Sequence, residues 1–198
     1  MNKAAFLDRD GVINRKAPEG NYVTRWEQFE ILPGVPGAIT SLNLAGYRVV
    51  VVSNQRCVAK GLISANDLDT LHQKMRVSLA ATGAILDGIY YCPHELDPPC
   101  SCRKPAPGML FDAAHDHAID LHNSWMIGDS IADTLAGRAA GCRTVLLTEN
   151  GSRSGQEPDI RARNLSEAVS EILVRDAVKS EVQMPDPDVE PQKRNLIR

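Results

Sequence analysis

Short apolar runs alternate with helical patterns along most of this chain, and this alternation constrains its fold more than any other feature. The apolar, strand-like runs cover residues 4–7, 48–52, 89–92, 125–127 and 143–147. The helical patterns cover residues 35–45, 107–119, 131–140, a segment from 64 to before 83, and a last one capped by Ser166 and reaching about residue 178. Such alternation is typical of βαβ units. We therefore predict an α/β fold with a doubly wound, mostly parallel sheet.

The length and charge of the chain limit its organisation and its partners. With 198 residues it can bury one substantial core, so we predict a single domain over residues 1–180. Residues 181–198 hold three prolines and little apolar content, which predicts an extended or mobile tail. A net charge of −3 argues against a general nucleic-acid binder. Membrane-spanning runs and a signal-peptide core are not evident, so we expect a cytoplasmic monomer.

Two carboxylates, Asp8 and Asp10, directly follow the first apolar run. In an open α/β sheet, the carboxyl ends of the strands form the edge where ligands bind. Close carboxylates repel each other unless a cation or a shared proton lies between them, so this pair predicts a Mg²⁺ site. A solvated turn is the alternative, because Asp and Gly are common in turns and Gly11 follows.

Matching polar residues lie at three other places on the same predicted edge. They are Ser53, Asn54 and Gln55 after the second run, Arg103 and Lys104 before a helix, and Asp129, Ser130 and Asp133 after the fourth run. A nucleophile, a hydroxyl, a lysine and a distal acid in this order form a set suited to phosphoryl transfer.

Four potential metal ligands lie within eleven residues: Cys92, His94, Cys100 and Cys102. Three thiolates and one imidazole fit a tetrahedral zinc site, and because all four ligands come from the protein the ion would be structural. Free thiols beside a hydrogen-bonded histidine are the alternative. Zinc here would hold the neighbouring Arg103 and Lys104 in place. Cys57 and Cys142 are interpreted as packing residues.

The ordered motifs from Asp8 to Asp133 resemble those of the haloacid dehalogenase superfamily of aspartate-nucleophile phosphatases, over roughly residues 4–150. Within it, the chain is similar to the D-glycero-D-manno-heptose 1,7-bisphosphate phosphatase group. The closer match rests on the segments at residues 6–11, 87–94 and 102–105. The cysteine loop is shorter than in many of that group, and its length resembles that of histidinol-phosphate phosphatases.

The resemblance implies a role for each motif residue. Asp8 would attack phosphorus to give an aspartyl-phosphate, and Asp10 would act as general acid and then general base. Mg²⁺ would be held by Asp8, Asp129 and the backbone carbonyl of Asp10. Ser53 and Lys104 would hold the phosphoryl oxygens, and Asp133 would orient Lys104. The cysteine loop of the resembled group implies zinc as the second metal.

The spacing between Asp10, Ser53 and Lys104 leaves room only for ordinary strand–helix units, so we expect a Rossmann-like haloacid dehalogenase fold without a cap domain. The substrate would then be selected by three loops, at residues 15–22, at residues 54–60 and at the cysteine loop, residues 92–102. Substrate contacts are predicted for Asn54, Gln55, Arg56, Arg103 and Ser130, with Arg103 on the phosphate that is not transferred.

Cations on these loops favour a sugar bisphosphate: Arg15, Lys16, Arg56, Lys60 and Arg103. Histidinol phosphate or another small sugar phosphate is the alternative substrate. The ammonium of histidinol phosphate would prefer a carboxylate such as Glu19. Two further possibilities are transfer to an acceptor other than water and a non-catalytic phosphosugar-binding protein. The last would be marked by loss of Asp8, Asp10 or Lys104, and all three are present.

Overall fold

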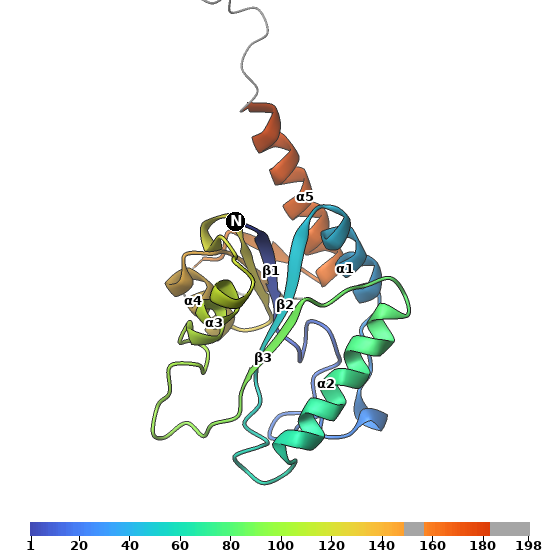
Figure 1. Ribbon diagram of the computed structural model, residues 1–198, viewed down its shortest axis with the longest axis vertical. Coiled ribbons are helices and arrows are strands. Elements are labelled where there is room, and N and C mark those ends of the chain that lie inside the picture. Colours follow the sequence, from blue (N-terminus) through green and yellow to red (C-terminus); the bar gives the residue numbers. More distant parts are fainter. Residues whose placement is uncertain (149–156, 183–198) are drawn as a thin grey trace, which may run out of the picture.

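The computed structural model describes residues 1–148 and 157–182, and these fold around one six-stranded sheet (Figure 1). The strands are β1 (Lys3–Leu7), β2 (Tyr47–Asn54), β3 (Gly88–Cys92), β4 (Trp125–Gly128), β5 (Arg143–Leu147) and β6 (Ile160–Ala162). Their order is β3-β2-β1-β4-β5-β6, and every neighbouring pair is parallel. The predicted α/β fold class is confirmed.

Five α-helices flank the sheet: α1 (Val35–Leu44), α2 (Ala65–Ala80), α3 (Gly108–Asp116), α4 (Ile131–Ala140) and α5 (Leu165–Val182). Short 3₁₀ turns lie at Trp26–Gln28 and Leu121–Asn123. In Figure 1, α1 and α2 lie on one side of the sheet and α3 and α4 on the other. The connections β1–β2, β2–β3, β3–β4 and β4–β5 each carry an ordinary helix and no inserted domain, as expected for a cap-less fold.

Alternate residues of the central strands supply two separate cores. Ala5 and Leu7 of β1 pack with α1, α2 and α5, whereas Ala4 and Phe6 pack with α3 and α4. All four side chains are fully buried. Burial on both faces explains why these strands appear in the sequence as continuous apolar runs rather than as alternating ones.

The helix starts test the predicted caps. Ser64 caps α2 as expected, because its Oγ accepts a hydrogen bond from the backbone N–H of Asp67 at 3.1 Å. The prediction that Ser166 caps the last helix is wrong. That helix begins at Leu165, and the Oδ1 atom of Asn164 accepts from the Glu167 N–H at 3.0 Å.

Other parts of the chain also differ from the sequence prediction. Helix α3 ends at Asp116, and Ala118 just beyond it has a positive φ of 50°, which is incompatible with a continuing helix. Strand β6 was not predicted, because three residues that include Arg161 form no apolar run. The predicted tail falls largely on residues 183–198, which lie outside the described part of the chain, while residues 181–182 belong to α5.

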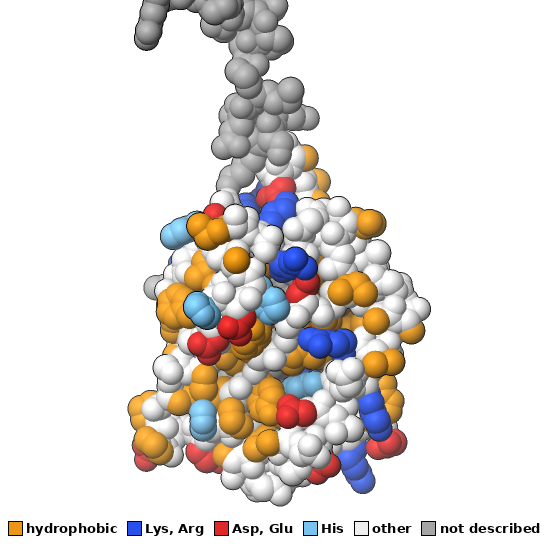
Figure 2. Space-filling view, in the orientation of Figure 1, with side chains coloured by type: hydrophobic (Ala, Val, Ile, Leu, Met, Phe, Trp, Pro, Cys, Tyr) orange, Lys and Arg blue, Asp and Glu red, His pale blue; other side chains and the backbone are white. Residues whose placement is uncertain are grey.

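On the face drawn in Figure 2, Lys and Arg side chains are scattered among acidic, apolar and polar ones. Among the described residues, none of the helices combines the length and the apolar content that crossing a bilayer requires.

Helix α4 lies close to the sheet at Gly137, which gives a test of the fold. A Cβ at this position would lie 2.6 Å from Cβ of Met126 and 2.9 Å from Cγ2 of Thr144. Overpacking of this kind typically costs about 1–3 kcal/mol, so Gly137→Ala should lower the free energy of unfolding, measured by chemical denaturation.

The matched control is Gly37→Ala in α1, where a Cβ would meet no atom within 4 Å. Because alanine restricts the unfolded chain, this variant should be more stable by roughly 0.4–1 kcal/mol. Equal stabilisation by both substitutions would contradict the close packing of α4.

Candidate active site

The carboxyl ends of β1, β2 and β4 meet at one edge of the sheet and line a cavity of about 350 Å³. The predicted residues among its lining are Asp8, Asp10, Ser53, Asn54, Lys104, Asp129, Ser130 and Asp133. Residues 16–23, from the segment between β1 and α1, form another wall. The structure therefore brings together the strand-end residues that the sequence separates by up to 125 positions.

Lys104 is a buried cation between two carboxylates. Its Nζ lies 3.0 Å from Oδ1 of Asp8 and 2.6 Å from Oδ1 of Asp133, and it donates to the Val52 carbonyl at 2.8 Å. Burial acts to lower the pKa of Lys104, but the two carboxylates raise it above its ordinary value. The ammonium is therefore held charged, and the expected contact with Asp133 is present.

The backbone of Lys104 is fixed by a side chain from β2. Asn54 donates from Nδ2 to the Lys104 carbonyl and accepts the Lys104 N–H at Oδ1, both at 3.0 Å. Asn54 was predicted to contact substrate, and it does line the cavity. Its two hydrogen bonds give it a further task, which is to join the loop that carries Lys104 to the end of β2.

Asp8 directly follows β1 and is held in place by its neighbours. Its Oδ1 accepts the Arg9 N–H at 2.7 Å in addition to its contact with Lys104. Burial raises the pKa of Asp8 to about 6, against the opposing effect of Lys104. A cation beside this carboxylate would favour its ionised form, which is the nucleophilic one.

Asp10 is held by three donors. Arg9 donates from Nη2 to both carboxylate oxygens at 3.0 and 2.9 Å, Asn14 donates to Oδ1 at 2.9 Å, and Gln55 donates to Oδ2 at 2.8 Å. Burial acts to raise the pKa of Asp10, but Arg9 and these hydrogen bonds lower it overall. Gln55 also donates to Ser53 Oγ at 2.9 Å. Although predicted to contact substrate, Gln55 is buried and joins two site residues.

Arg9 and His72 were missed as site residues by the sequence analysis. The Arg9 side chain is fully buried, and its Nη1 lies 3.1 Å from Nε2 of His72 in α2. Burial and the neighbouring guanidinium lower the pKa of His72 to about 3, so its neutral ring accepts this hydrogen bond. The position of Arg9 between two acids could have indicated an internal counter-ion, but nothing in the sequence pointed to His72.

Oxygen ligands suited to a divalent metal gather beside Asp8. Carboxylate oxygens of Asp8, Asp129 and Asp133 lie within 4.8 Å of one another, and Oδ1 of Asp129 is buried without a hydrogen-bond partner. Carboxylate oxygens suit Mg²⁺. A Cβ on Gly11 would lie 2.3 Å from Oδ2 of Asp129, and Gly11 has a φ of +90°, so glycine is needed for this approach.

Protein donors already engage the acids of this cluster to different extents. Asp133 is engaged by Lys104 and by the N–H and hydroxyl of Ser130, at 3.1 and 2.6 Å. The Asp10 carboxylate is directed to Arg9, so Asp10 would contribute its backbone carbonyl, as the resemblance implies. The predicted magnesium ligands fit the donor set that the structure offers.

Three loop arginines that were expected to face the substrate contact protein acceptors instead. Arg15 pairs with Glu30, Arg56 pairs with Glu95 at 2.5 Å, and Arg103 donates to the His94 carbonyl at 3.3 Å. Among the described residues, the cations that line the cavity are Lys104 and Lys16.

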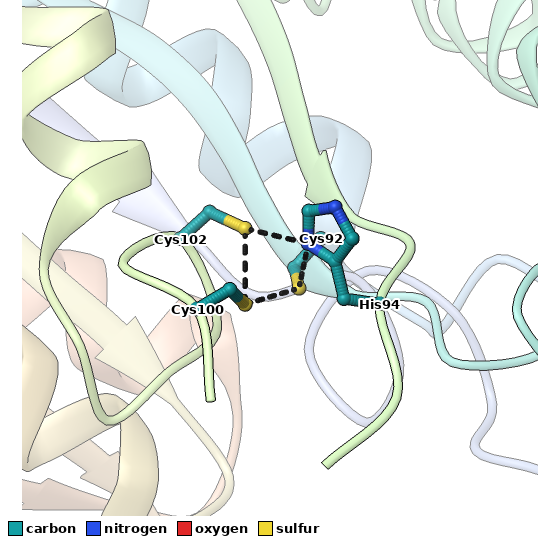
Figure 3. A group of neighbouring side chains, drawn as sticks. All are labelled: Cys92, His94, Cys100 and Cys102. Carbon is teal, nitrogen blue, oxygen red and sulfur yellow. Dashed lines mark hydrogen bonds between the residues drawn. The ribbon is translucent and has the colours of Figure 1, made fainter. Parts of the chain in front are cut away.

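The four zinc-ligand candidates converge at the end of β3, as Figure 3 shows. The Sγ atom of Cys100 lies 3.5 Å from that of Cys92 and 3.4 Å from that of Cys102, and Nδ1 of His94 lies 3.2 Å from the Cys102 sulfur. Ligands about 2.0–2.3 Å from a shared zinc would be separated by about 3.3–3.8 Å. These residues therefore fit one tetrahedral ion.

Comparison with known proteins agrees with this fold and identifies the family of the chain. The family model described as haloacid dehalogenase-like hydrolase matches residues 2–141. The chain belongs to the haloacid dehalogenase-like hydrolases. The resemblance drawn from the motifs is confirmed, and with it the expectation of an enzyme.

Similar members of this family have been named by their activity. A D-glycero-β-D-manno-heptose-1,7-bisphosphate 7-phosphatase from Pasteurella multocida is 37% identical over 87% of this chain and 95% of its own length. An α-anomer 7-phosphatase from Mycobacterium bovis is 40% identical over 78% of this chain and 83% of its own length.

A solved structure also matches this haloacid dehalogenase-like hydrolase. It is a D,D-heptose 1,7-bisphosphate phosphatase from B. bronchiseptica, complexed with magnesium and phosphate. It superposes with a TM-score of 0.80 and is 36% identical, over 87% of this chain and 99% of that one.

The contacts of Asn54 lead to a prediction that separates stability from activity. Asn54→Ala leaves the backbone N–H and carbonyl of Lys104 without these partners, so it should cost about 1–3 kcal/mol of stability and also reduce turnover. Denaturation and phosphate release from an aryl phosphate would measure the two effects.

Asn43→Ala provides the matched control. Asn43 makes the same pair of hydrogen bonds to the backbone of Ile85, at 3.1 and 2.9 Å, outside the cavity lining. These hydrogen bonds are more exposed than those of Asn54, so Asn43→Ala should lose less stability, with turnover unchanged. Similar losses of turnover in the two variants would show that Asn54 does not act through Lys104.

Proposed function

We propose that this protein is a Mg²⁺-dependent phosphatase that removes the 7-phosphate of D-glycero-D-manno-heptose 1,7-bisphosphate through an aspartyl-phosphate on Asp8. The observation that carries the proposal is the convergence of Asp8, Asp10 and Lys104 on one cavity of a haloacid dehalogenase-like hydrolase. The named activities of similar relatives support the heptose substrate.

Each residue has a step in the proposed reaction. The Asp8 carboxylate attacks phosphorus, a new P–O bond forms, and the bond to the leaving sugar oxygen breaks. Because the pKa of Asp10 is lowered in the free protein, Asp10 first takes up a proton from solvent, then delivers it to that oxygen, and finally takes one from the water that hydrolyses the intermediate. Arg9, Asn14 and Gln55 hold the Asp10 carboxylate in one orientation for both transfers.

Charge on the transferring group is met by donors that are already in place. The Lys104 ammonium lies 3.0 Å from the Asp8 oxygen and is fixed by Asp133, so it need not reorganise. Ser53 accepts a hydrogen bond from Gln55, which leaves its own proton available for a phosphoryl oxygen. Asp8, Asp129 and the Asp10 carbonyl would hold Mg²⁺, which would reduce the repulsion between carboxylate and phosphate.

Histidinol phosphate remains the second candidate substrate, because Glu19 lines the cavity and could pair with its ammonium. Phosphate release would be compared across both heptose bisphosphate anomers, the heptose monophosphates and histidinol phosphate. The proposal requires the highest kcat/KM for a bisphosphate, and a preference for histidinol phosphate would overturn it.

A structural zinc ion is the second metal of the proposal. Cys92 ends β3, and Cys102 lies two residues before Lys104. Zinc bound by Cys92, His94, Cys100 and Cys102 would tie the loop that carries Lys104 to the sheet, while Arg103 braces the same loop through the His94 carbonyl.

Replacement of the nucleophile tests the covalent mechanism. Asp8→Asn preserves the size of the side chain but removes the attacking charge, so turnover should fall by orders of magnitude while the fold persists. Asp10→Asn should lose about 10²–10⁴-fold. Asp112→Asn, an exposed change on α3, is the control and should be fully active. Near-normal phosphate release by Asp8→Asn would exclude the aspartyl-phosphate.

Elemental analysis tests the zinc site. Protein purified without added metal should hold about one zinc per chain. Cys100→Ser should lose the ion and lower the Tm, because binding energy at a structural site contributes to folding. Cys142→Ala, which changes a buried cysteine in the core, should retain the zinc. Retention of zinc by Cys100→Ser would contradict this ligand set.

A further inference from the structure

Lys16 occupies an unusual position in the cavity. Its Nζ lies 2.7 Å from Oδ2 of Asp129, although Lys16 belongs to the segment between β1 and α1 and Asp129 follows β4. Asp129 is the acid whose other oxygen, Oδ1, is buried without a hydrogen-bond partner. A protein cation therefore contacts the same carboxylate that the proposed metal requires.

The ion pair between Lys16 and Asp129 can open at small energetic cost. The Lys16 side chain is 59% exposed, whereas Lys104 is 2% exposed. Exposed ion pairs contribute little net stability, so the Lys16 ammonium can leave Asp129 at small cost. A lysine ammonium is charged at neutral pH, so the group that would leave carries a positive charge.

A divalent cation and this ammonium compete for one carboxylate. A metal ion on Oδ1 and an ammonium on Oδ2 of one carboxylate would lie within a few ångströms of each other and would repel. We infer that Lys16 is a resident counter-ion of the metal site, which a divalent cation displaces from Asp129 and which then pairs with the phosphate of the bound substrate.

Once displaced from Asp129, Lys16 can pair with the phosphate of a substrate in the cavity. Lys104 is fixed between Asp8 and Asp133, and Arg15, Arg56 and Arg103 contact protein acceptors. Lys16 is thus the exposed cation among the described residues that line the cavity. A phosphate entering the cavity meets it there. This inference rests on the proposed function, because it requires the proposed metal site.

Metal affinity provides the first test, with Mg²⁺ alone as the probe. Calorimetry on zinc-containing protein would compare the wild type with Lys16→Met and Lys16→Gln. Removal of the competing ammonium should tighten Mg²⁺ binding about two- to five-fold, the range expected for loss of an exposed ion pair. Lys16→Arg, which keeps the charge, should bind Mg²⁺ with nearly wild-type affinity.

Arg15→Met is the matched control for general electrostatics. It removes one positive charge from the adjacent position, where the side chain pairs with Glu30. Its Mg²⁺ affinity should stay at the wild-type value. Equal tightening in Arg15→Met, or no tightening in either Lys16 variant, would overturn the inference.

Binding of inorganic phosphate tests whether the displaced Lys16 pairs with a phosphate. With Mg²⁺ saturating, phosphate should bind about two- to five-fold more weakly to Lys16→Met than to the wild type. Unchanged phosphate affinity would show that the displaced ammonium does not meet the substrate. Failure of the proposed function would be seen separately, as a wild-type protein that binds no Mg²⁺ or releases no phosphate from sugar phosphates.

Discussion

The structure depends on keeping four carboxylates together at one sheet edge without mutual repulsion. Asp8, Asp10, Asp129 and Asp133 all line the same cavity, and each contacts a cationic side chain. Lys104 lies between Asp8 and Asp133, Arg9 neutralises Asp10, and Lys16 meets Asp129. Lys104 and Arg9 are buried, so the cations beside Asp8, Asp10 and Asp133 are held in place. Lys16 is exposed, so the cation beside Asp129 can be exchanged.

Much of this arrangement followed from the sequence, because the parallel topology places the strand ends side by side. The acids after β1 and β4 could be assigned to one site since those strands are neighbours in the sheet. The local capping of α2 by Ser64 was equally predictable. Strand β6 was not, because its three residues pair only with β5 and carry no periodic pattern of their own.

The unpredicted features depend on contacts between distant positions. Arg56 and Glu95 are 39 residues apart, and Arg9 and His72 are 63 apart, so neither pairing leaves a local pattern. Basic residues on loops near the cavity can therefore pair with protein acceptors, as Arg56 does. His72 is the clearest example: an apparently ordinary helix residue is held neutral by burial and accepts from the guanidinium that orients Asp10.

The position of Lys104 links the two metal sites of the proposal. Its backbone is held by Asn54 at the end of β2 and its ammonium by two acids. Its loop would be held by the proposed zinc ligands, which begin at the end of β3. A Cβ on Gly108, where α3 begins, would lie 2.4 Å from the Ser101 carbonyl oxygen, so the loop also packs tightly against that helix. In a site without a cap domain, zinc would therefore restrict the motion of the loop that carries Lys104. The positive charge beside Asp8 would then be in place before a substrate binds.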